Sequence, residues 1–368
     1  MDHNEHDENR GFSSQYLPSY SVGPKAYDNV AEICLKYGKK AVAVGGKRAL
    51  AAAKDELEKA IAGTGLEIID YIWYGGEASY ENAEMVMSQP KFKEADMIFA
   101  FGGGKALDTC KYSSCISKKP VFTFPTIAGT CAAASTEAIM YYPTGVMRDT
   151  YETIKPAVHI FINTQIIANA PEVYLWTGIG DTMAKHFETS LAGRGRELSH
   201  GNALGVEMAS MCYKPLVKYG EKALADCKTH TPSYELQQIC LCNIITTGMV
   251  SGFIEFSLNS SIAHSLFYGM TVLPQIEKNH LHGEVVSYGV LVLLMYDGQM
   301  DKLNELYPFY KAVGLPTKLA DIEVKYEELA PAIDKCLEVD DIHNAPYEVT
   351  AEKLYKAIAD LEEYNKKN

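Results

Sequence analysis

The sequence has fewer basic than acidic residues and no long apolar run, and its cysteines do not follow a regular spacing. Its 34 Lys and Arg against 47 Asp and Glu give a formal net charge of −13. Nucleic acids and anionic membranes attract basic surfaces, so this charge disfavours both as main partners. No apolar run approaches the roughly 18–20 residues that a membrane-spanning helix needs. We therefore expect neither a nucleic acid nor a membrane as a partner.

The nine cysteines lack the spacing of a metal site or a disulfide framework. The nearest pair, Cys240 and Cys242, lies inside an apolar stretch. Such cysteines are typical of a reducing compartment, where they act as small buried side chains. Residues 1–11 are polar and acidic, and they lack the basic and apolar regions of a signal peptide. Both features favour a cytoplasmic location.

The chain is long enough for two domains, with 368 residues of which 47% are hydrophobic. Its first part alternates apolar runs with stretches of helical period. Strands alternating with helices predict βαβ units and a parallel sheet whose strands are buried on both faces. Strands are expected near residues 40–46, 66–75, 96–104, 120–126 and 157–164, and helices near residues 49–61, 80–87 and 105–116.

The alternation ends near residue 164, and Pro171 follows soon after. Beyond it the chain is apolar with helical period, and strand-like runs are scarce. We therefore expect an α/β domain over residues 1–170 and an all-helical domain over residues 171–368.

A run of three glycines stands between an expected strand and an expected helix, in "FGGGKALDTCKY". Parallel sheets bind ligands beyond the carboxyl ends of their strands. Glycines let backbone N–H groups approach a phosphate, and a helix N-terminus adds partial positive charge. A tight turn without a ligand is the alternative, and the spacing is not that of a G-x-G-x-x-G fingerprint. The expected phosphate site contains Gly102, Gly103 and Gly104, with Lys105 as a point charge and Asp108 in the first helical turn.

A second glycine pair, Gly45 and Gly46, follows the first expected strand and precedes Lys47 and Arg48. An acidic residue near this place suits the ribose 2′-hydroxyl of NAD, whereas a basic one suits the 2′-phosphate of NADP. Two solvated charges at the start of a helix are the alternative. The cofactor is therefore NAD or NADP, with a preference for NADP.

Two histidines and a carboxylate in the second half form a candidate metal site. They are Asp181 after a glycine pair, His264 in a helical stretch, and His282 in "NHLHGEVVSYG". Three protein ligands would leave a fourth position open for water or substrate. Taken singly, each residue has another reading: an aspartate after glycine as a helix N-cap, and a lone histidine as a hydrogen-bonded core residue.

At these residues the chain resembles the iron-containing alcohol dehydrogenase superfamily, and within it the glycerol dehydrogenase branch. The resemblance runs from about Pro18 to the last helices. The matching motifs, in family order, are "PSYSVGPKAYDNV", "VGGKRAL", "GGGKALDTCKY", "FPTIAGT", "GIGDTMAKHFE", "IAHSLFYGM" and "HLHGEVVSYG". The family has an N-terminal dinucleotide-binding α/β domain and a C-terminal all-helical domain with the metal ligands.

The resemblance implies roles for single residues. The three glycines of residues 102–104 would meet the pyrophosphate, with Asp108 supporting their loop. Asp181, His264 and His282 would be the metal ligands. Thr126 and Thr130 would approach the cofactor, and Lys155 would lie near the nicotinamide.

Three positions depart from the family pattern. Lys185 replaces the further histidine ligand of iron-type members, so the site resembles the three-ligand version and favours zinc over iron. Because Lys185 lies one helical turn after Asp181, it could instead pair with the carboxylate of Asp181. Tyr268 stands where many members have a histidine near the nicotinamide, and it can still donate a hydrogen bond. Cys131 replaces an aspartate that contacts glycerol in glycerol dehydrogenases, which argues against glycerol itself.

The expected function is a metal-dependent oxidoreductase that transfers a hydride between NAD(P)(H) and a small alcohol or polyol, or the matching aldehyde or ketone. Its catalytic residues would be Asp181, His264, His282 and Tyr268. One alternative is a lyase similar to dehydroquinate synthase, which uses NAD as a transient oxidant. Another is a non-catalytic nucleotide binder. Members of this branch often form homo-oligomers, and we expect the same here.

Overall fold

The structure is a computed structural model that describes residues 14–153 and 155–368. The acidic stretch 1–11, on which part of the expected location rests, lies outside the described residues. The chain forms two compact units. The first contains the described residues up to Ala170 together with Thr229–Pro232, and the second contains Pro171–Lys228 and Ser233–Asn368.

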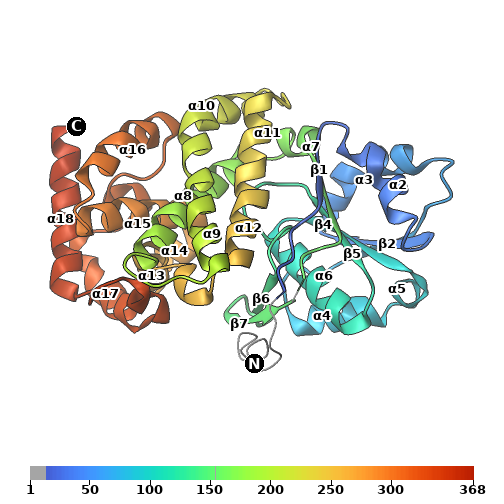
Figure 1. Cartoon of the computed structure of the whole chain (residues 1–368), viewed down its shortest axis with the longest axis horizontal. Helices are drawn as coiled ribbons and strands as arrows, with labels where there is room; N and C mark the ends of the chain where they lie inside the picture. Colours follow the sequence, from blue (N-terminus) through green and yellow to red (C-terminus); the bar gives the residue numbers. More distant parts are fainter. Residues whose placement is uncertain (1–13, 154) are drawn as a thin grey trace. The chain divides into compact units, whose positions relative to one another are not determined.

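The first unit is built on a six-stranded sheet with the order β1-β8-β5-β4-β2-β3 (Figure 1). All neighbouring strands are parallel. The predicted α/β fold with a parallel sheet is therefore confirmed. The strands of this sheet are β1 Tyr20–Gly23, β2 Lys40–Gly45, β3 Glu67–Trp73, β4 Met97–Gly102, β5 Val121–Pro125 and β8 His159–Asn163.

Three strands had no counterpart in the predictions. β1 pairs with β8 at one edge of the sheet. The strands β6 (Glu137–Tyr141) and β7 (Met147–Glu152) form a separate antiparallel pair. The residues of β7 are largely exposed, and only the last residue of β1 is buried. Both segments therefore lack the apolar runs that predicted the central strands.

Helices cover both faces of the sheet. One face packs against α2 and α3 through a cluster that includes Met97, Phe99 and Phe101 of β4, and Figure 1 shows α4, α5 and α6 on the other face. Alternate residues of a strand point to opposite faces, which explains this division. The helices of this unit are η1 Ala26–Asn29, α2 Val30–Cys34, α3 Lys47–Ile61, α4 Tyr80–Ser88, α5 Pro90–Glu94, α6 Gly104–Ser117 and α7 Thr164–Ala168.

The second unit is helical in its described residues, as expected. Its longest helix, α8 (Glu172–Ala192), packs against α15 (His282–Tyr296), and α15 also contacts α13 (Ile262–Met270). The other helices are α9 His200–Met208, η2 Ala209–Cys212, α10 Lys214–Lys228, α11 Tyr234–Cys240, η3 Leu241–Thr246, α12 Thr247–Phe253, η4 Phe256–Leu258, α14 Pro274–Asn279, α16 Met300–Val313, η5 Leu319–Ile322, η6 Tyr326–Glu328, α17 Leu329–Glu338, η7 Asp340–Asn344 and α18 Ala351–Lys367.

Glycines let α8, α13 and α15 approach one another closely. A Cβ atom at Gly283 of α15 would lie 2.0 Å from the carbonyl oxygen of Thr177 and 2.9 Å from the Cβ of Asp181, both in α8. A Cβ atom at Gly289 of α15 would lie 2.6 Å from the carbonyl oxygen of Ala263 in α13. At both positions the helix backbones are too close to leave room for a side chain, so the two glycines set the spacing of the three helices.

Among the described residues, no helix combines the length and the apolar character needed to cross a membrane.

Candidate metal centre

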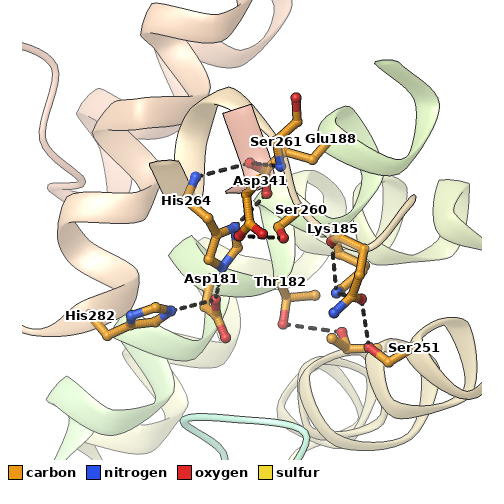
Figure 2. A network of polar contacts seen from close by, with 12 residues as sticks. Asp181, Thr182, Lys185, Glu188, Ser251, Ser260, Ser261, His264, His282 and Asp341 are labelled. Carbon is orange, nitrogen blue, oxygen red and sulfur yellow. Dashed lines mark hydrogen bonds and ion pairs between the residues drawn. The ribbon is translucent and has the colours of Figure 1, made fainter. Parts of the chain in front are cut away.

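Three helices of the second unit bring Asp181, His264 and His282 together. Asp181 lies inside α8, His264 near the start of α13, and His282 at the first position of α15. The Nε2 atoms of His264 and His282 lie 3.4 Å and 3.3 Å from the same carboxylate oxygen, Oδ1 of Asp181 (Figure 2). One potential ligand atom from each residue lies within 4.8 Å of the others. The sequence-predicted triad therefore converges on one place.

The donor set fits a divalent metal such as zinc or ferrous iron. Two imidazole nitrogens and one carboxylate oxygen are the ligand types that both ions accept, and three ligands leave a coordination position open. The alternative reading of Asp181 as a helix N-cap is wrong, because α8 begins at Glu172 and Asp181 lies in its interior. The side chain of Asp181 is 18% exposed and that of His282 is 42% exposed, so the triad is open to solvent on one side.

The three groups form a tightly coupled charge cluster. Burial alone would raise the pKa of the Asp181 carboxyl, but hydrogen bonds from His264 and His282 hold it well below its usual range. Burial alone would lower the pKa of His264, but the carboxylates of Glu188 and Asp181 raise it to about 10. The site therefore has an ionised carboxylate and an imidazole with high proton affinity, and a metal ion would replace protons there.

Glu188 is a residue of this site that sequence reasoning missed. It is fully buried in α8, about two helical turns after Asp181. Its Oε2 lies 2.5 Å from Nδ1 of His264, and its Oε1 accepts the backbone N–H groups of Ser261 and His264 at 2.8 and 2.9 Å. Burial raises the pKa of Glu188, but the charge of His264 and these hydrogen bonds bring it below its ordinary value. The only sequence signal was its position on the same face of the helix as Asp181.

A second glutamate fixes the segment that carries His282. Glu284 accepts the backbone N–H of Leu281 at 3.1 Å, which caps the start of α15. Its other oxygen lies 3.0 Å from Nδ1 of His280. His280 therefore bonds to Glu284 and does not join the triad. The ring of Phe267 packs edge-on against the imidazole of His282, with the ring centroids 4.4 Å apart. This contact further restricts the orientation of the imidazole.

The expected alternative pairing of Lys185 with Asp181 is wrong. The Nζ of Lys185 donates to Oδ1 of Asn259 at 2.5 Å and to its carbonyl oxygen at 3.2 Å. Asn259 offers two acceptors next to η4, so the lysine is held away from the carboxylate of Asp181 (Figure 2). Tyr268 lies one turn after His264 on α13, with its ring centroid 6.5 Å from that of His264.

In the first unit, the predicted glycine loop lies at the carboxyl end of β4. Gly102 has φ +139°, which favours glycine, and Gly103 caps α6, which begins at Gly104. The N–H of Thr126, after β5, donates to the carbonyl oxygen of Gly102 at 3.2 Å. The Oγ1 of Thr130 would lie 3.4 Å from a Cβ atom at Gly104. The fold thus brings the three glycines and both threonines to one edge of the sheet.

Two charged residues of this loop, Asp108 and Lys105, both have ion-pair partners in the structure. Asp108 lies beyond the first turn of α6, so its expected place in that turn is wrong. It is buried, 2.9 Å from Nζ of Lys111, and it accepts the N–H of Ile139. Asp108 therefore binds a buried cation and the β6 backbone, and is not positioned to interact with the helix N-terminus. Lys105 is paired with Glu77 at 2.7 Å.

The second glycine pair has two different environments. A Cβ atom at Gly45 would lie 2.3 Å from the carbonyl oxygen of Phe101 on the neighbouring strand β4, so packing alone requires this glycine. At Gly46 the nearest atom would be 3.8 Å away. Lys47, the first residue of α3, places its ammonium group over the ring of Trp73 at 4.8 Å. Lys155 stands over the ring of Tyr16 at the same distance.

Comparisons with known proteins agree with this architecture. The family model described as iron-containing alcohol dehydrogenase matches residues 18–161. The glycerol dehydrogenase of Thermotoga maritima is 32% identical, and the match covers 87% of this chain and 91% of that protein. Hydroxycarboxylate dehydrogenase A of Escherichia coli K12 is 33% identical, with coverage of 88% and 90%. The structure of glycerol dehydrogenase from Schizosaccharomyces pombe superposes with a TM-score of 0.83 at 24% identity, covering 97% of this chain and 92% of that chain.

The α/β unit, the helical unit and these relatives define an NAD(P)-dependent oxidoreductase of the alcohol dehydrogenase type. The chain belongs to the iron-containing alcohol dehydrogenase family.

Proposed function

We propose that this protein transfers a hydride between NAD(P) and a small alcohol or polyol, with one divalent metal held by Asp181, His264 and His282. The observation that carries the proposal is the convergence of both imidazole Nε2 atoms on Oδ1 of Asp181. When bound, the metal supplies a Lewis acid for the substrate oxygen, and the nicotinamide carries the hydride. Zinc is the preferred ion, because Lys185 occupies the position of a further histidine ligand and bonds to Asn259.

The residues of the site have distinct roles in this proposal. The carboxylate of Asp181 contributes the negative charge that a divalent cation requires, and the two imidazoles are neutral donors. Tyr268, one turn from His264, would donate a hydrogen bond to the substrate or the nicotinamide. The half-exposed side chain of His282 leaves a solvent-facing side for substrate.

Cofactor binding belongs to residues 1–170 in this proposal, and metal binding belongs to residues 171–368. The first N–H groups of α6 have no partner within the helix, so they can donate to a pyrophosphate. The sites of close approach would be Gly102, Gly103 and Gly104, with Thr126 and Thr130 beside them. Gly45 and Gly46 would form the neighbouring loop, Lys105 would leave Glu77 for a phosphate, and Asp108 would support the loop through Lys111.

The preference for NADP is supported by Lys47, which stands at the N-terminus of α3 and is held over Trp73. Lys155 remains a proposed neighbour of the nicotinamide. We also propose that the protein is a cytoplasmic homo-oligomer. Cys131 argues for a substrate other than glycerol, and the relative named as a hydroxycarboxylate dehydrogenase makes small hydroxycarboxylic acids worth testing beside polyols.

A redox assay tests the proposed reaction. The protein is stripped of metal and reloaded with zinc or ferrous iron. It is then given small alcohols, polyols and hydroxycarboxylic acids with NAD⁺ or NADP⁺, and aldehydes and ketones with the reduced cofactors. We expect metal-dependent net formation or consumption of NAD(P)H matched by product. Substrate turnover without any net change in NAD(P)H would indicate the lyase alternative. Dinucleotide binding without turnover of any substrate would indicate a non-catalytic binder, and either result overturns the proposal.

A further inference from the structure

We infer that Glu188 is a positioning residue that holds His264 in the form that binds metal through Nε2. The inference rests on the proposed metal site and adds a residue to it. Glu188 does not belong to the triad of potential ligands. Its position behind His264, on the side opposite Asp181, assigns it a different task (Figure 2).

The geometry of His264 is fixed from both ends. Nδ1 lies 2.5 Å from Oε2 of Glu188, and Nε2 lies 3.4 Å from Oδ1 of Asp181. An ionised carboxylate can only accept hydrogen bonds, so the proton of a neutral His264 must lie on Nδ1. The lone pair is then on Nε2, which faces Asp181 and the site. Histidine ligands of metals commonly donate their other N–H to a carboxylate in this way, which sets the tautomer and the ring orientation.

The carboxylate of Glu188 is itself held rigidly. The side chain is fully buried, and Oε1 accepts the backbone N–H groups of Ser261 and His264 at the start of α13. The two oxygens therefore do different things. Oε1 caps the helix that carries the ligand, whereas Oε2 binds the imidazole. A purely structural role needs only the first contact, and a positioning role needs the second.

A single substitution separates these two roles. In Glu188→Gln the amide oxygen can keep both backbone hydrogen bonds, and the NH₂ group then faces Nδ1 of His264. An amide NH₂ is a donor, so Nδ1 must accept and the imidazole proton moves to Nε2. That nitrogen faces the metal position. The variant should therefore retain the fold and lose the correct tautomer.

Asp341→Asn is the matched control. Asp341 is also a buried carboxyl in this region, and it accepts a hydrogen bond from the hydroxyl of Ser260 at 2.7 Å (Figure 2). The substitution makes the same change from carboxyl to amide. Its hydrogen-bond partner is the serine, so the imidazole of His264 keeps its carboxylate.

The test measures the zinc dissociation constant of the full chain by chelator competition, together with thermal unfolding of the metal-free proteins. We expect Glu188→Gln to weaken zinc binding about 10- to 100-fold with an unfolding temperature near that of the wild type. Asp341→Asn should keep the wild-type dissociation constant. An unchanged constant in Glu188→Gln, or an equal loss in both variants, overturns the role of Glu188. A wild-type protein that binds no zinc would instead overturn the metal site of the proposed function.

A second measurement needs no folded variant of Glu188. Nitrogen-15 NMR of the zinc-loaded wild type reports which imidazole nitrogen carries the proton. The His264 signals are assigned by their absence in His264→Asn. We expect a proton on Nδ1 and none on Nε2. A proton on Nε2 overturns the inference, even if Glu188→Gln fails to fold.

Discussion

Gly180 of α8 and Gly283 of α15 lie directly against each other beside the candidate metal centre. A Cβ atom at Gly180 would lie 2.3 Å from the carbonyl oxygen of Gly283. Asp181 and His282 are the chain neighbours of these two glycines. The distance between a carboxylate and an imidazole of the triad therefore depends on two residues that have no side chains.

Gly283→Ala should push α8 and α15 apart and weaken metal binding. The new methyl group would overlap backbone atoms of α8, which cannot move aside as a flexible side chain can. We expect a loss of about 1–3 kcal/mol in the free energy of unfolding, together with a higher zinc dissociation constant. Urea unfolding and zinc titration measure the two effects. Gly252→Ala is the control, since a Cβ there meets no atom within 4 Å, and it should be neutral or slightly stabilising.

His264→Ala and His282→Ala should both abolish metal binding but differ in stability. His264 stands between Asp181 and Glu188, so its removal leaves a fully buried carboxylate without its partner. We expect His264→Ala to cost about 3–5 kcal/mol in the metal-free protein. His282 is 42% exposed, and its removal should cost less than about 1 kcal/mol. Metal analysis and urea unfolding in the presence of chelator measure these effects. Full metal content in either variant would contradict the ligand assignment.

Metal affinity should rise with pH through the neutral range. The pKa of His264 is raised to about 10, so at neutral pH the imidazole is protonated and a metal ion must displace its proton. A rise in pH lowers this competition. We expect the zinc association constant to increase about tenfold per pH unit below pH 10 for the one proton of His264. Zinc titrations at several pH values, corrected for protonation of the chelator, measure the slope. A flat profile would show that this imidazole is neutral before the metal binds.

Gly104→Ala should weaken dinucleotide binding without harming the fold. A Cβ atom at this position would be 3.4 Å from Oγ1 of Thr130, an ordinary contact, and alanine suits the first turn of a helix. The methyl group would keep a pyrophosphate from the first N–H groups of α6. We expect at least a tenfold weaker affinity, about 1.4 kcal/mol, with an unchanged unfolding curve. Calorimetric titration with NAD(H) and NADP(H) measures the affinity. Wild-type affinity would contradict the proposed phosphate site at Gly102, Gly103 and Gly104.

Lys47→Ala should lower kcat/KM for NADPH more than for NADH. The ammonium group of Lys47 at the start of α3 would pair with the 2′-phosphate, which NADH lacks. We expect a selective loss of about tenfold. Lys54→Ala is a matched control on the same helix, because Lys54 also stands 4.8 Å from the centre of an aromatic ring, that of Tyr71. An equal loss with both cofactors would refute the proposed contact with a 2′-phosphate.

The sequence predicted the central sheet well because its strands are buried on both faces. Unbroken apolar runs mark such strands, and β2, β4, β5 and β8 all follow them closely. The strand β1 and the pair β6–β7 gave no such signal. β1 is short and only partly buried, β6 buries only alternate residues, and β7 is largely exposed. The pairing of β1 also depends on β8, far along the chain.

Within the candidate site, the metal triad could be predicted from its motifs, whereas its surroundings could not. Glu188 looks like any polar residue of a long helix until α13 is placed against it. Lys185 shows the converse case. Its spacing on α8 suggested a pairing with Asp181, but Asn259, far along the chain, supplies two acceptors. Asp108 likewise bonds to Lys111 and to the backbone of β6, an element that the sequence did not predict.

The crowding at Gly45 limits how cofactor preference can evolve in this chain. Any side chain at that position would overlap the backbone of β4, so only glycine fits there. Gly46, one residue further, has room. A carboxylate that would favour the ribose hydroxyls of NAD could therefore be accommodated at position 46 but not at position 45. The same restriction applies to directed evolution: substitutions at position 45 are expected to destabilise the first unit, whereas those at position 46 are not.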